Sequence, residues 1–338
     1  MTNFWHTLPR PFFALAPMAN VTDAAFRRLI AKYGKPDVMW TEFVSCDGLL
    51  SAGREKLLVD LWYSEAERPI VAQIFGAVPE HFYQCAQLVA SLGFDGIDIN
   101  MGCPDRAVEK QGAGAALMKN PKLAKEIIAQ TKRGADGLPV SIKTRMGYSK
   151  NELEAWLPHL LEAEPAAVTL HLRTRKEMSS VPAHWDAAAQ AREIIERFGG
   201  ASAASAGGRT LLIGNGDSAT LADAQEKAQR YGVDGVMIGR GVFGSPFLFA
   251  GGEQKRPEER LRVMLEHTTL FEKLYGPNRT PDTIKQPWLK NFDVMKKHYQ
   301  AYVSGWPGAK ELRAQLMTAE SAAETAAIVA RRYPNIAP

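Results

Sequence analysis

One cysteine of this chain follows directly on a predicted strand, in a setting that suits chemistry more than packing. Residues 96–99 read as a buried parallel strand, and Asn100 and Cys103 come just after it. Gly102 and Pro104 flank the cysteine, and neither a helix nor a central strand tolerates that pair, so the thiol lies in a loop past the strand. A lone cysteine is more often a small packing residue. Amide and thiol groups at the carboxyl end of a parallel strand are nevertheless typical of an active site.

Polar residues also end other predicted strands, and these ends meet in one place if the strands form a barrel. The full set is Gln73, Asn100, Cys103, Lys143, Arg145, His171, Arg173, Asn215 and the segment 239–241. Lys143 ends an apolar run, and at a barrel mouth it would face a pocket instead of extending to solvent. His171 also ends an apolar run, where a packed histidine is the common alternative. Together these residues predict a polar pocket at the mouth.

Glycine-rich turns end the last two predicted strands. Residues 214–217 end the seventh strand and residues 239–241 end the eighth. Glycines let backbone N–H groups approach an anion, and Arg240 can bind a phosphate with two parallel hydrogen bonds. The loops after strands seven and eight are also the usual phosphate site of a barrel. Either segment alone could be an ordinary tight turn, but together they predict a cofactor that carries phosphate.

Several classes of site are excluded by what the sequence lacks. No cluster of His, Cys and carboxylate residues has metal-ligand spacing, and no P-loop, G-x-S-x-G or paired-carboxylate arrangement lies at the strand ends. The three cysteines have no disulfide or zinc spacing, and Cys85 lies in an apolar pattern of helical period. Redox chemistry on a bound flavin remains, because a lysine at the mouth can hold negative charge near the pyrimidine edge of a reduced flavin.

Eight runs of β-branched and apolar residues alternate with helical patterns over the first 250 residues. The runs are residues 12–16, 38–41, 70–75, 96–99, 140–144, 167–170, 211–214 and 235–238. Among the helical patterns are residues 23–33, opened by Thr22, and residues 218–231, with Ser218 as N-cap. Eight such units in about 250 residues predict an α/β fold, the (β/α)₈ TIM barrel. A doubly wound sheet, which usually has fewer strands, is the alternative.

The pattern changes after Phe249. Residues 251–257 have the composition of a linker, and long helical patterns without strand signals follow to Arg332. We therefore expect a catalytic barrel over residues 1–250 and a C-terminal all-helical domain over residues 251–338. The segment 199–208, rich in Gly, Ser and Ala, is expected to be a flexible loop on the barrel face opposite the chemistry.

The composition is that of an ordinary soluble globular protein, with 46% hydrophobic and 23% charged residues. No apolar run approaches the roughly 20 residues that cross a bilayer, and the N-terminus does not resemble a signal peptide, so we expect a cytoplasmic protein that contacts no membrane. The net charge of +4 lies entirely in residues 251–338, which hold 14 Lys and Arg against 10 Asp and Glu. This excess is either a solvated helical surface or a face that binds a polyanion.

The chain resembles the tRNA-dihydrouridine synthases, flavin enzymes that reduce uridine in tRNA. The motifs that carry the resemblance span the predicted barrel, at residues 16–19, 22–23, 41–42, 72–76, 98–104, 112–117, 142–145, 171, 173–175, 215–217 and 239–241. The Asn-x-Gly-Cys-Pro element at 100–104 is the most specific, whereas Gly-Arg-Gly is shared with other flavin barrels. Residues 297–299, 305 and 308–313 also resemble the family's helical domain.

The resemblance implies where cofactor and substrate bind. FMN would lie across the mouth, held by Pro17, Met18, Gln73, Lys143, His171, Asn215, Asp217, Gly239 and Arg240. NADPH would reduce the flavin, whose N5 would then deliver a hydride to C6 of the uracil. Cys103, on the opposite face, would donate a proton to C5, since a thiol with a pKa of about 8.5 is protonated at neutral pH. Asn100 and Arg145 would orient the base, and no metal would take part.

A target uridine must leave the tRNA fold to reach such a mouth, so the resemblance implies recognition of the tRNA by shape and extrusion of one base. The basic helical domain would bind the tRNA, and we expect the enzyme to be a monomer. The face expected to meet phosphate carries Lys285, Lys290, Lys296, Lys297, Lys310 and Arg313, interleaved with Trp288, Tyr299 and Trp306. The alternative is that these aromatic residues form the core of the domain.

One position departs from the family's usual His-Gly-Arg-Thr, because Leu172 stands in place of the glycine. The departure bears on how closely backbone or substrate approaches there. Two other functions also fit parts of the sequence. A flavin barrel of the dihydroorotate dehydrogenase kind acts on a free pyrimidine and needs no basic helical domain. A non-catalytic RNA-binding protein needs none of Cys103, Lys143 and His171.

Overall fold

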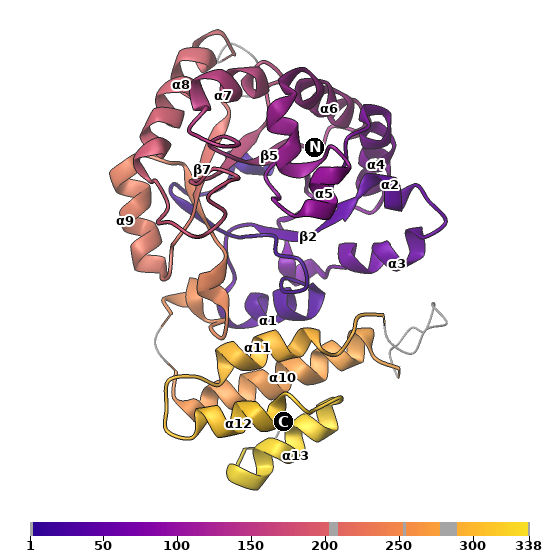
Figure 1. The fold of residues 1–338 in the computed structure, drawn as a ribbon, viewed down its shortest axis with the longest axis vertical. Coiled ribbons are helices and arrows are strands. Elements are labelled where there is room, and N and C mark those ends of the chain that lie inside the picture. Colours follow the sequence, from indigo (N-terminus) through magenta and orange to yellow (C-terminus); the bar gives the residue numbers. More distant parts are fainter. Residues whose placement is uncertain (1–2, 203–208, 253–254, 278–288, 337–338) are drawn as a thin grey trace.

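The computed structural model describes residues 3–202, 209–252, 255–277 and 289–336, and for residues 199–202 it describes the backbone alone. Within these ranges eight parallel strands form one sheet in the order β1-β8-β7-β6-β5-β4-β3-β2 (Figure 1). The strands are β1 (Phe12–Leu15), β2 (Met39–Ser45), β3 (Ile70–Phe75), β4 (Gly96–Asn100), β5 (Val140–Arg145), β6 (Ala167–His171), β7 (Leu211–Asn215) and β8 (Gly235–Ile238). A parallel bridge between Ala14 and Val38 joins the first strand to the last in this order. The sheet therefore closes, and the predicted (β/α)₈ barrel is confirmed.

Four of the strands end one residue later than the sequence predicts, on the polar residues Asn100, Arg145, His171 and Asn215. The register places these ends side by side. Asn100 pairs with Lys143 across β4 and β5, Arg145 with His171 across β5 and β6, and His171 with Asn215 across β6 and β7. The polar strand ends thus form neighbouring positions around the mouth of the barrel.

Helices and short 3₁₀ turns precede, connect or follow the strands, and most of the helices cover the outside of the barrel. They are η1 (Phe4–His6), α1 (Ala24–Gly34), α2 (Cys46–Leu49), α3 (Arg54–Leu58), η2 (Val59–Leu61), η3 (Glu65–Glu67), α4 (Pro79–Ser91), α5 (Arg106–Lys110), η4 (Gly114–Lys119), α6 (Pro121–Gly134), α7 (Leu153–Leu161), α8 (Asp186–Ser202), α9 (Leu221–Tyr231), η5 (Arg240–Val242) and η6 (Leu248–Ala250). The main core lies between these helices and the sheet. A second core fills the barrel, where Trp5 of η1 packs against Phe12 and Trp40 with ring centroids 5.7 and 5.9 Å away.

Three local predictions are corrected by the structure. Asp23, not Thr22, caps α1, and the Thr22 hydroxyl instead accepts a hydrogen bond from the Met18 N–H. Thr220, not Ser218, caps α9, because the turn after β7 is longer than the helical pattern suggests. The predicted loop 199–208 begins as helix, since α8 continues to Ser202, and residues 203–208 lie outside the described part.

In the described part of residues 251–336, four further helices form a C-terminal helical region beside α1 (Figure 1). They are α10 (Pro257–Tyr275), α11 (Val294–Tyr302), α12 (Ala309–Leu316) and α13 (Ala322–Arg332). The contact with the barrel is aromatic, since Phe26 of α1 lies 5.1 Å from the His267 ring and 4.7 Å from the His298 ring. Over the described ranges, every helix is too short or too polar to cross a membrane.

Candidate active site

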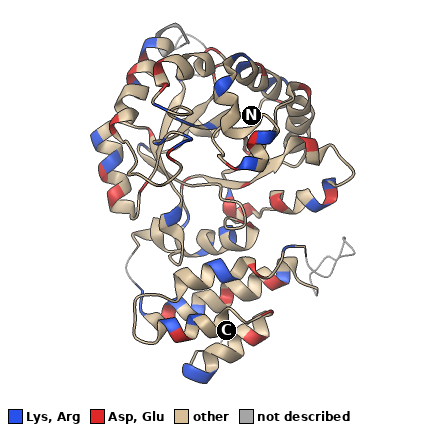
Figure 2. Cartoon of the chain, viewed as in Figure 1, with Lys and Arg blue, Asp and Glu red and all other residues tan. Residues whose placement is uncertain are grey.

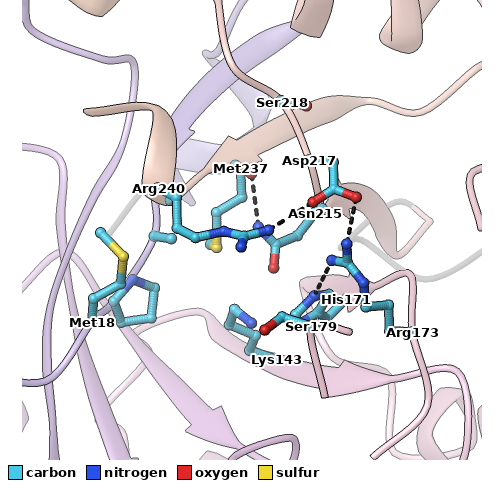
Figure 3. Close-up of a pocket in the computed structure, with 14 residues that line it drawn as sticks. Met18, Lys143, His171, Arg173, Ser179, Asn215, Asp217, Ser218, Met237 and Arg240 are labelled. Carbon is cyan, nitrogen blue, oxygen red and sulfur yellow. Dashed lines mark hydrogen bonds and ion pairs between the residues drawn. The ribbon is translucent and has the colours of Figure 1, made fainter. Parts of the chain in front are cut away.

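A pocket of about 280 Å³ opens at the carboxyl ends of β1, β5, β6, β7 and β8 (Figure 3). Its lining is Ala16, Pro17, Met18, Lys143, His171, Arg173, Ser179, Asn215, Gly216, Asp217, Ser218, Met237, Gly239 and Arg240. The structure therefore brings together all of the cofactor residues expected from the sequence except Gln73. The eight that line the pocket come from five different strand ends, which is the arrangement that a barrel mouth imposes.

Lys143 projects its ammonium group into this pocket (Figure 3). Burial, and then repulsion from Arg145, lowers the pKa of Lys143 from 10.5 to about 8, while attraction to Asp98 and Cys103 opposes the fall. Among the described residues no side chain or carbonyl forms a hydrogen bond or ion pair with this ammonium. The lysine is therefore a cation ready to pair with negative charge on a ligand.

His171 lies next to Lys143 on the β6 side of the pocket, and Arg173 lies beyond His171, toward Asp217 (Figure 3). Burial, and then the charges of Lys143 and Arg145, lowers the pKa of His171 well below 6.5, so its ring is neutral. Nη1 of Arg173 lies 3.3 Å from Nε2 of His171. A guanidinium group can only donate, so Nε2 accepts and the ring proton resides on Nδ1. His171 is thus a neutral hydrogen-bond donor at the pocket.

Asp217 holds two arginines at the other end of the pocket. Its Oδ1 accepts from Nη2 of Arg240 at 2.7 Å, and its Oδ2 accepts from Arg173 and, at 2.8 Å, from the Ala183 N–H. The hydrogen bond from Arg173 lowers the pKa of Asp217 below 3.8, so the group is a carboxylate. Two guanidinium groups around one carboxylate leave a net positive charge, which suits an anion such as a phosphate.

Asn215, Ser218 and Gly239 complete this end of the pocket. Nδ2 of Asn215 donates to the Met237 carbonyl at 2.8 Å, so the amide oxygen remains available to a ligand. The buried Ser218 hydroxyl has no hydrogen-bond partner among the described residues. A Cβ at Gly239 would lie 3.5 Å from both Ala16 and Met18, so the glycine leaves open a space between the loops after β1 and β8. The donors and the open space fit a phosphate-bearing ligand.

Cys103 lies in the loop after β4, which is held by a chain of amide side chains. Oδ1 of Asn100 accepts from the N–H groups of Gly102 and Cys103 at 3.1 and 2.9 Å, and its Nδ2 donates to Oε1 of Gln73 at 3.0 Å. Nε2 of Gln73 in turn donates to Asp98 at 2.6 Å. Neither Gln73, Asn100 nor Cys103 lines the pocket. Asn100 holds the backbone of Gly102 and Cys103, and Gln73 holds the Asn100 amide. Burial raises the pKa of the Cys103 thiol above 9.0, so the thiol is protonated at neutral pH.

Arg145 supports the same loop from the β5 side. Its Nε donates to the Gly102 carbonyl at 2.8 Å, and its Nη1 donates to the carbonyls of Thr174 and Met178 at 3.1 and 3.2 Å. The side chain is 6% exposed. Arg145 therefore ties the cysteine loop to the segment after β6, and its predicted contact with the base remains a prediction.

Six lining residues have no role assigned from the sequence. Ala16 and Gly216 lie within segments that carry the family resemblance, and Arg173 belongs to the set of polar strand ends, so its spacing from His171 could have shown that it faces the same mouth. The sequence pattern predicts Ser218 as a helix cap, and Ser179 and Met237 give no sequence signal that distinguishes them from loop and core residues. Leu172, the departure from the family pattern, is fully buried in the main core and does not line the pocket.

The basic face expected on the helical domain is only partly formed. Lys285 and Trp288 lie outside the described residues. The prediction that Lys290 is an exposed phosphate contact is wrong, because its side chain is 8% exposed and pairs with Glu42 and Asp60. Tyr299 is fully buried, so the core alternative holds for it. Lys297 and Lys310 are exposed, and Figure 2 shows basic and acidic residues interspersed over α10 to α13.

Comparison with known proteins identifies the family. Residues 14–336 match the family model described as dihydrouridine synthase. The chain is 42% identical over 330 residues to a probable tRNA-dihydrouridine synthase of Staphylococcus aureus (strain COL), covering 97% of this chain and 94% of the relative. It is 39% identical over 329 residues to probable tRNA-dihydrouridine synthase 2 of Bacillus subtilis (strain 168), covering 97% and 95%. Among solved structures, histamine dehydrogenase from Rhizobium sp. 4-9 aligns with a TM-score of 0.49 and 15% identity, over 76% of this chain and 48% of that one. The chain belongs to the dihydrouridine synthase family, and its activity is the synthesis of dihydrouridine in tRNA.

Proposed function

We propose that the mouth pocket binds FMN, that NADPH is the reductant, and that Cys103 protonates the uracil ring of a uridine extruded from tRNA. Family membership supports a flavin. The anion site around Asp217 supports a flavin with one phosphate, held by Arg240, Arg173 and the free hydroxyl of Ser218. The lining by Pro17 and Met18 supplies apolar contact for a flat ring. These features make FMN the cofactor that the residues fit.

The residues around the flavin would divide the chemistry among them. When bound, the flavin supplies a hydride from N5 to C6 of the uracil. Lys143 would hold negative charge at the pyrimidine edge of the flavin, and neutral His171 would donate a hydrogen bond there from Nδ1. Gln73, also expected to hold the flavin, does not line the pocket, and its amide instead bonds Asn100 and Asp98.

Cys103 would act as the general acid. The step needs a protonated group on the face of the uracil opposite the hydride donor, and the raised pKa of the half-buried thiol keeps its proton in place at neutral pH. Asn100 and Arg145 would fix the thiol through the backbone of Gly102 and Cys103, since both side chains bond that backbone. An acid held in a fixed position speeds the reaction, because the proton must reach C5 of the uracil from one face of the ring. This half-buried, protonated thiol on a loop held by Asn100 and Arg145 is the observation that carries the proposal.

The remaining expectations follow from this assignment. The barrel over residues 1–250 would bind FMN and the base, and the helical domain over residues 251–338 would bind tRNA through exposed lysines such as Lys297 and Lys310. We propose a cytoplasmic monomer that uses no metal. The family match favours this function over a free-pyrimidine reductase and over a non-catalytic RNA-binding protein.

The test is mass spectrometry for dihydrouridine in unmodified tRNA incubated with the protein, FMN and NADPH. Wild type should form dihydrouridine, whereas Cys103→Ala should lose product and still oxidise NADPH through the flavin. NADPH oxidation by wild type without modified tRNA would point to a free pyrimidine. Neither reaction, despite bound flavin, would overturn the proposed chemistry.

A further inference from the structure

The loop between β1 and α1 forms one wall of the flavin pocket and has a strained backbone. Pro17 and Met18 line the pocket. Met18 and Thr22 close the loop, because the Met18 N–H donates to the Thr22 hydroxyl at 2.8 Å and the Thr22 N–H donates to the Met18 carbonyl at 3.0 Å. Asn20, between them, has a φ of 54°, a conformation that residues other than glycine adopt at a cost. The backbone N–H of Asn20 is also held by a hydrogen bond from outside the loop.

Glu42 of β2 provides this hydrogen bond. Its Oε1 accepts a hydrogen bond from the Asn20 N–H at 2.5 Å. The residue is 3% exposed, and burial raises its pKa from 4.5 to about 7 although the charge of Lys290 opposes the rise. A buried carboxylate without a cation takes up a proton, and a protonated oxygen is a weaker acceptor for the Asn20 amide. The strength of the hydrogen bond between Glu42 and the Asn20 N–H thus depends on a cation beside Glu42.

Lys290 supplies that charge from the helical domain. Its Nζ lies 2.5 Å from Oε2 of Glu42 and 2.5 Å from Oδ1 of Asp60. Asp23 lies in the same environment, and its buried Oδ2 has no hydrogen-bond partner among the described residues. Lys290 therefore pairs with Glu42 and Asp60 where the barrel meets the helical domain, and it shares with Arg27 the role of offsetting the charge of Asp23.

A second group of the helical domain contacts the far end of the loop. The hydroxyl of Tyr275, the last residue of α10, accepts a hydrogen bond from the Ala24 N–H at 3.0 Å. The β1–α1 loop is thus held at Asn20 through Glu42 and Lys290, and at Ala24 through Tyr275. The helical domain thus contacts the same β1–α1 loop whose residues Pro17 and Met18 line the pocket.

We propose that Lys290 is a positioning residue for the flavin, which it affects through Glu42 and the Asn20 backbone without touching cofactor or RNA. The inference rests on the proposed function, since it assumes that the pocket binds FMN. Removing the ammonium leaves Glu42 protonated, relaxes Asn20 and displaces Pro17 and Met18. Because coupling between two sites is reciprocal, bound FMN also strengthens the contact between barrel and helical domain.

The test measures the FMN dissociation constant of the flavin-free full chain by quenching of flavin fluorescence. Lys290→Met should raise this constant about tenfold, equivalent to about 1.4 kcal/mol, and Lys290→Arg should restore most of the affinity. Glu42→Gln should weaken FMN binding similarly and should not add to Lys290→Met in the double variant. Lys273→Met, which changes an exposed lysine of α10, should leave the constant unchanged.

The outcomes separate this inference from the proposed function. If wild type binds no FMN, the proposed function fails first. If Lys290→Met binds FMN as wild type does but has a higher KM for tRNA, Lys290 contacts RNA and the inference is overturned. If Lys290→Met does not fold, Glu42→Gln and Lys290→Arg test the inference in its place. An FMN affinity of Glu42→Gln equal to that of wild type would also overturn the inference.

Discussion

Replacing Lys143 with methionine should make the flavin-free protein more stable at pH 7, although it should impair catalysis. The ammonium is largely buried, and its pKa is about 8 in place of 10.5. One pKa unit corresponds to about 1.4 kcal/mol, so the folded protein holds this charge at a cost of about 3 kcal/mol. Methionine keeps the apolar stem and removes the charge. We therefore expect the free energy of unfolding to rise by about 1 to 3 kcal/mol.

The gain should depend on pH in a defined direction. Below about pH 8 Lys143 is charged in the folded and the unfolded chain, so the full cost is present. Between about pH 8 and pH 10.5 the folded protein loses the proton first, and wild type gains stability relative to Lys143→Met. Above pH 10.5 Lys143 is neutral in both the folded and the unfolded chain, so the difference in stability that its charge causes disappears.

Urea unfolding of the flavin-free proteins at about pH 7 and about pH 10, followed by circular dichroism, measures the effect. Lys150→Met is the matched control, because Lys150 is an exposed lysine in the loop after the same strand and should give no gain at either pH. Equal stability of Lys143→Met and wild type at pH 7 would refute the reasoning. So would a gain that is undiminished at pH 10, because it would come from packing and not from charge.

Three further predictions concern the cysteine loop and the barrel framework. Cys103→Ala should lower dihydrouridine formation about 10²- to 10⁴-fold in single-turnover assays, while flavin reduction by NADPH stays normal. In wild type, the protonation of the uracil by Cys103 should slow only above pH 9.0, because burial raises the pKa of the thiol above that value. Gly114→Ala should lower kcat, because the new Cβ would lie 2.8 Å from the Cys103 carbonyl. Gly137→Ala is the control: its backbone also has a positive φ, 81°, but its new Cβ would have no atom within 4 Å, so this variant should lose stability and keep its kcat. Equal kcat values for the two variants would contradict this. Arg27→Met should destabilise the protein by about 3 to 5 kcal/mol in thermal or urea unfolding, since it leaves fully buried Glu67 without its 2.7 Å partner and with only the more distant Arg28, 3.6 Å away, as a cation. A loss under about 1 kcal/mol would contradict this expectation.

The sequence predicts the barrel well because its signal is local. Runs such as residues 140–144 are apolar and β-branched between turn residues, and each forms a strand with little change in its bounds. The errors lie at the carboxyl ends, where Asn100 and His171 are polar and look like loop residues although the ladder continues through them. Strand position then predicts which residues share the mouth, since the ends of parallel strands are neighbours by topology.

What the sequence does not predict depends on contacts between distant segments. Ser179 reaches the pocket because the segment after β6 folds back, and the Ala183 N–H bonds Asp217 across 34 positions. No periodic pattern marks that return. Lys290 looks like any surface lysine, and its role as a buried counter-ion depends on Glu42, 248 positions away. Charge type is readable from a sequence, but burial of that charge is a property of the packed domains.

The buried cluster of Glu42, Asp60 and Lys290 also limits how this enzyme can be recombined with its relatives. A helical domain from another member, grafted onto this barrel to change which uridine is reduced, brings its own residue at position 290. If that residue lacks a positive charge, two carboxylates are left at the junction without a counter-ion, and the hybrid is destabilised before substrate choice can be assessed. The recombination unit is therefore larger than the domain, and it includes the two barrel carboxylates that face the lysine.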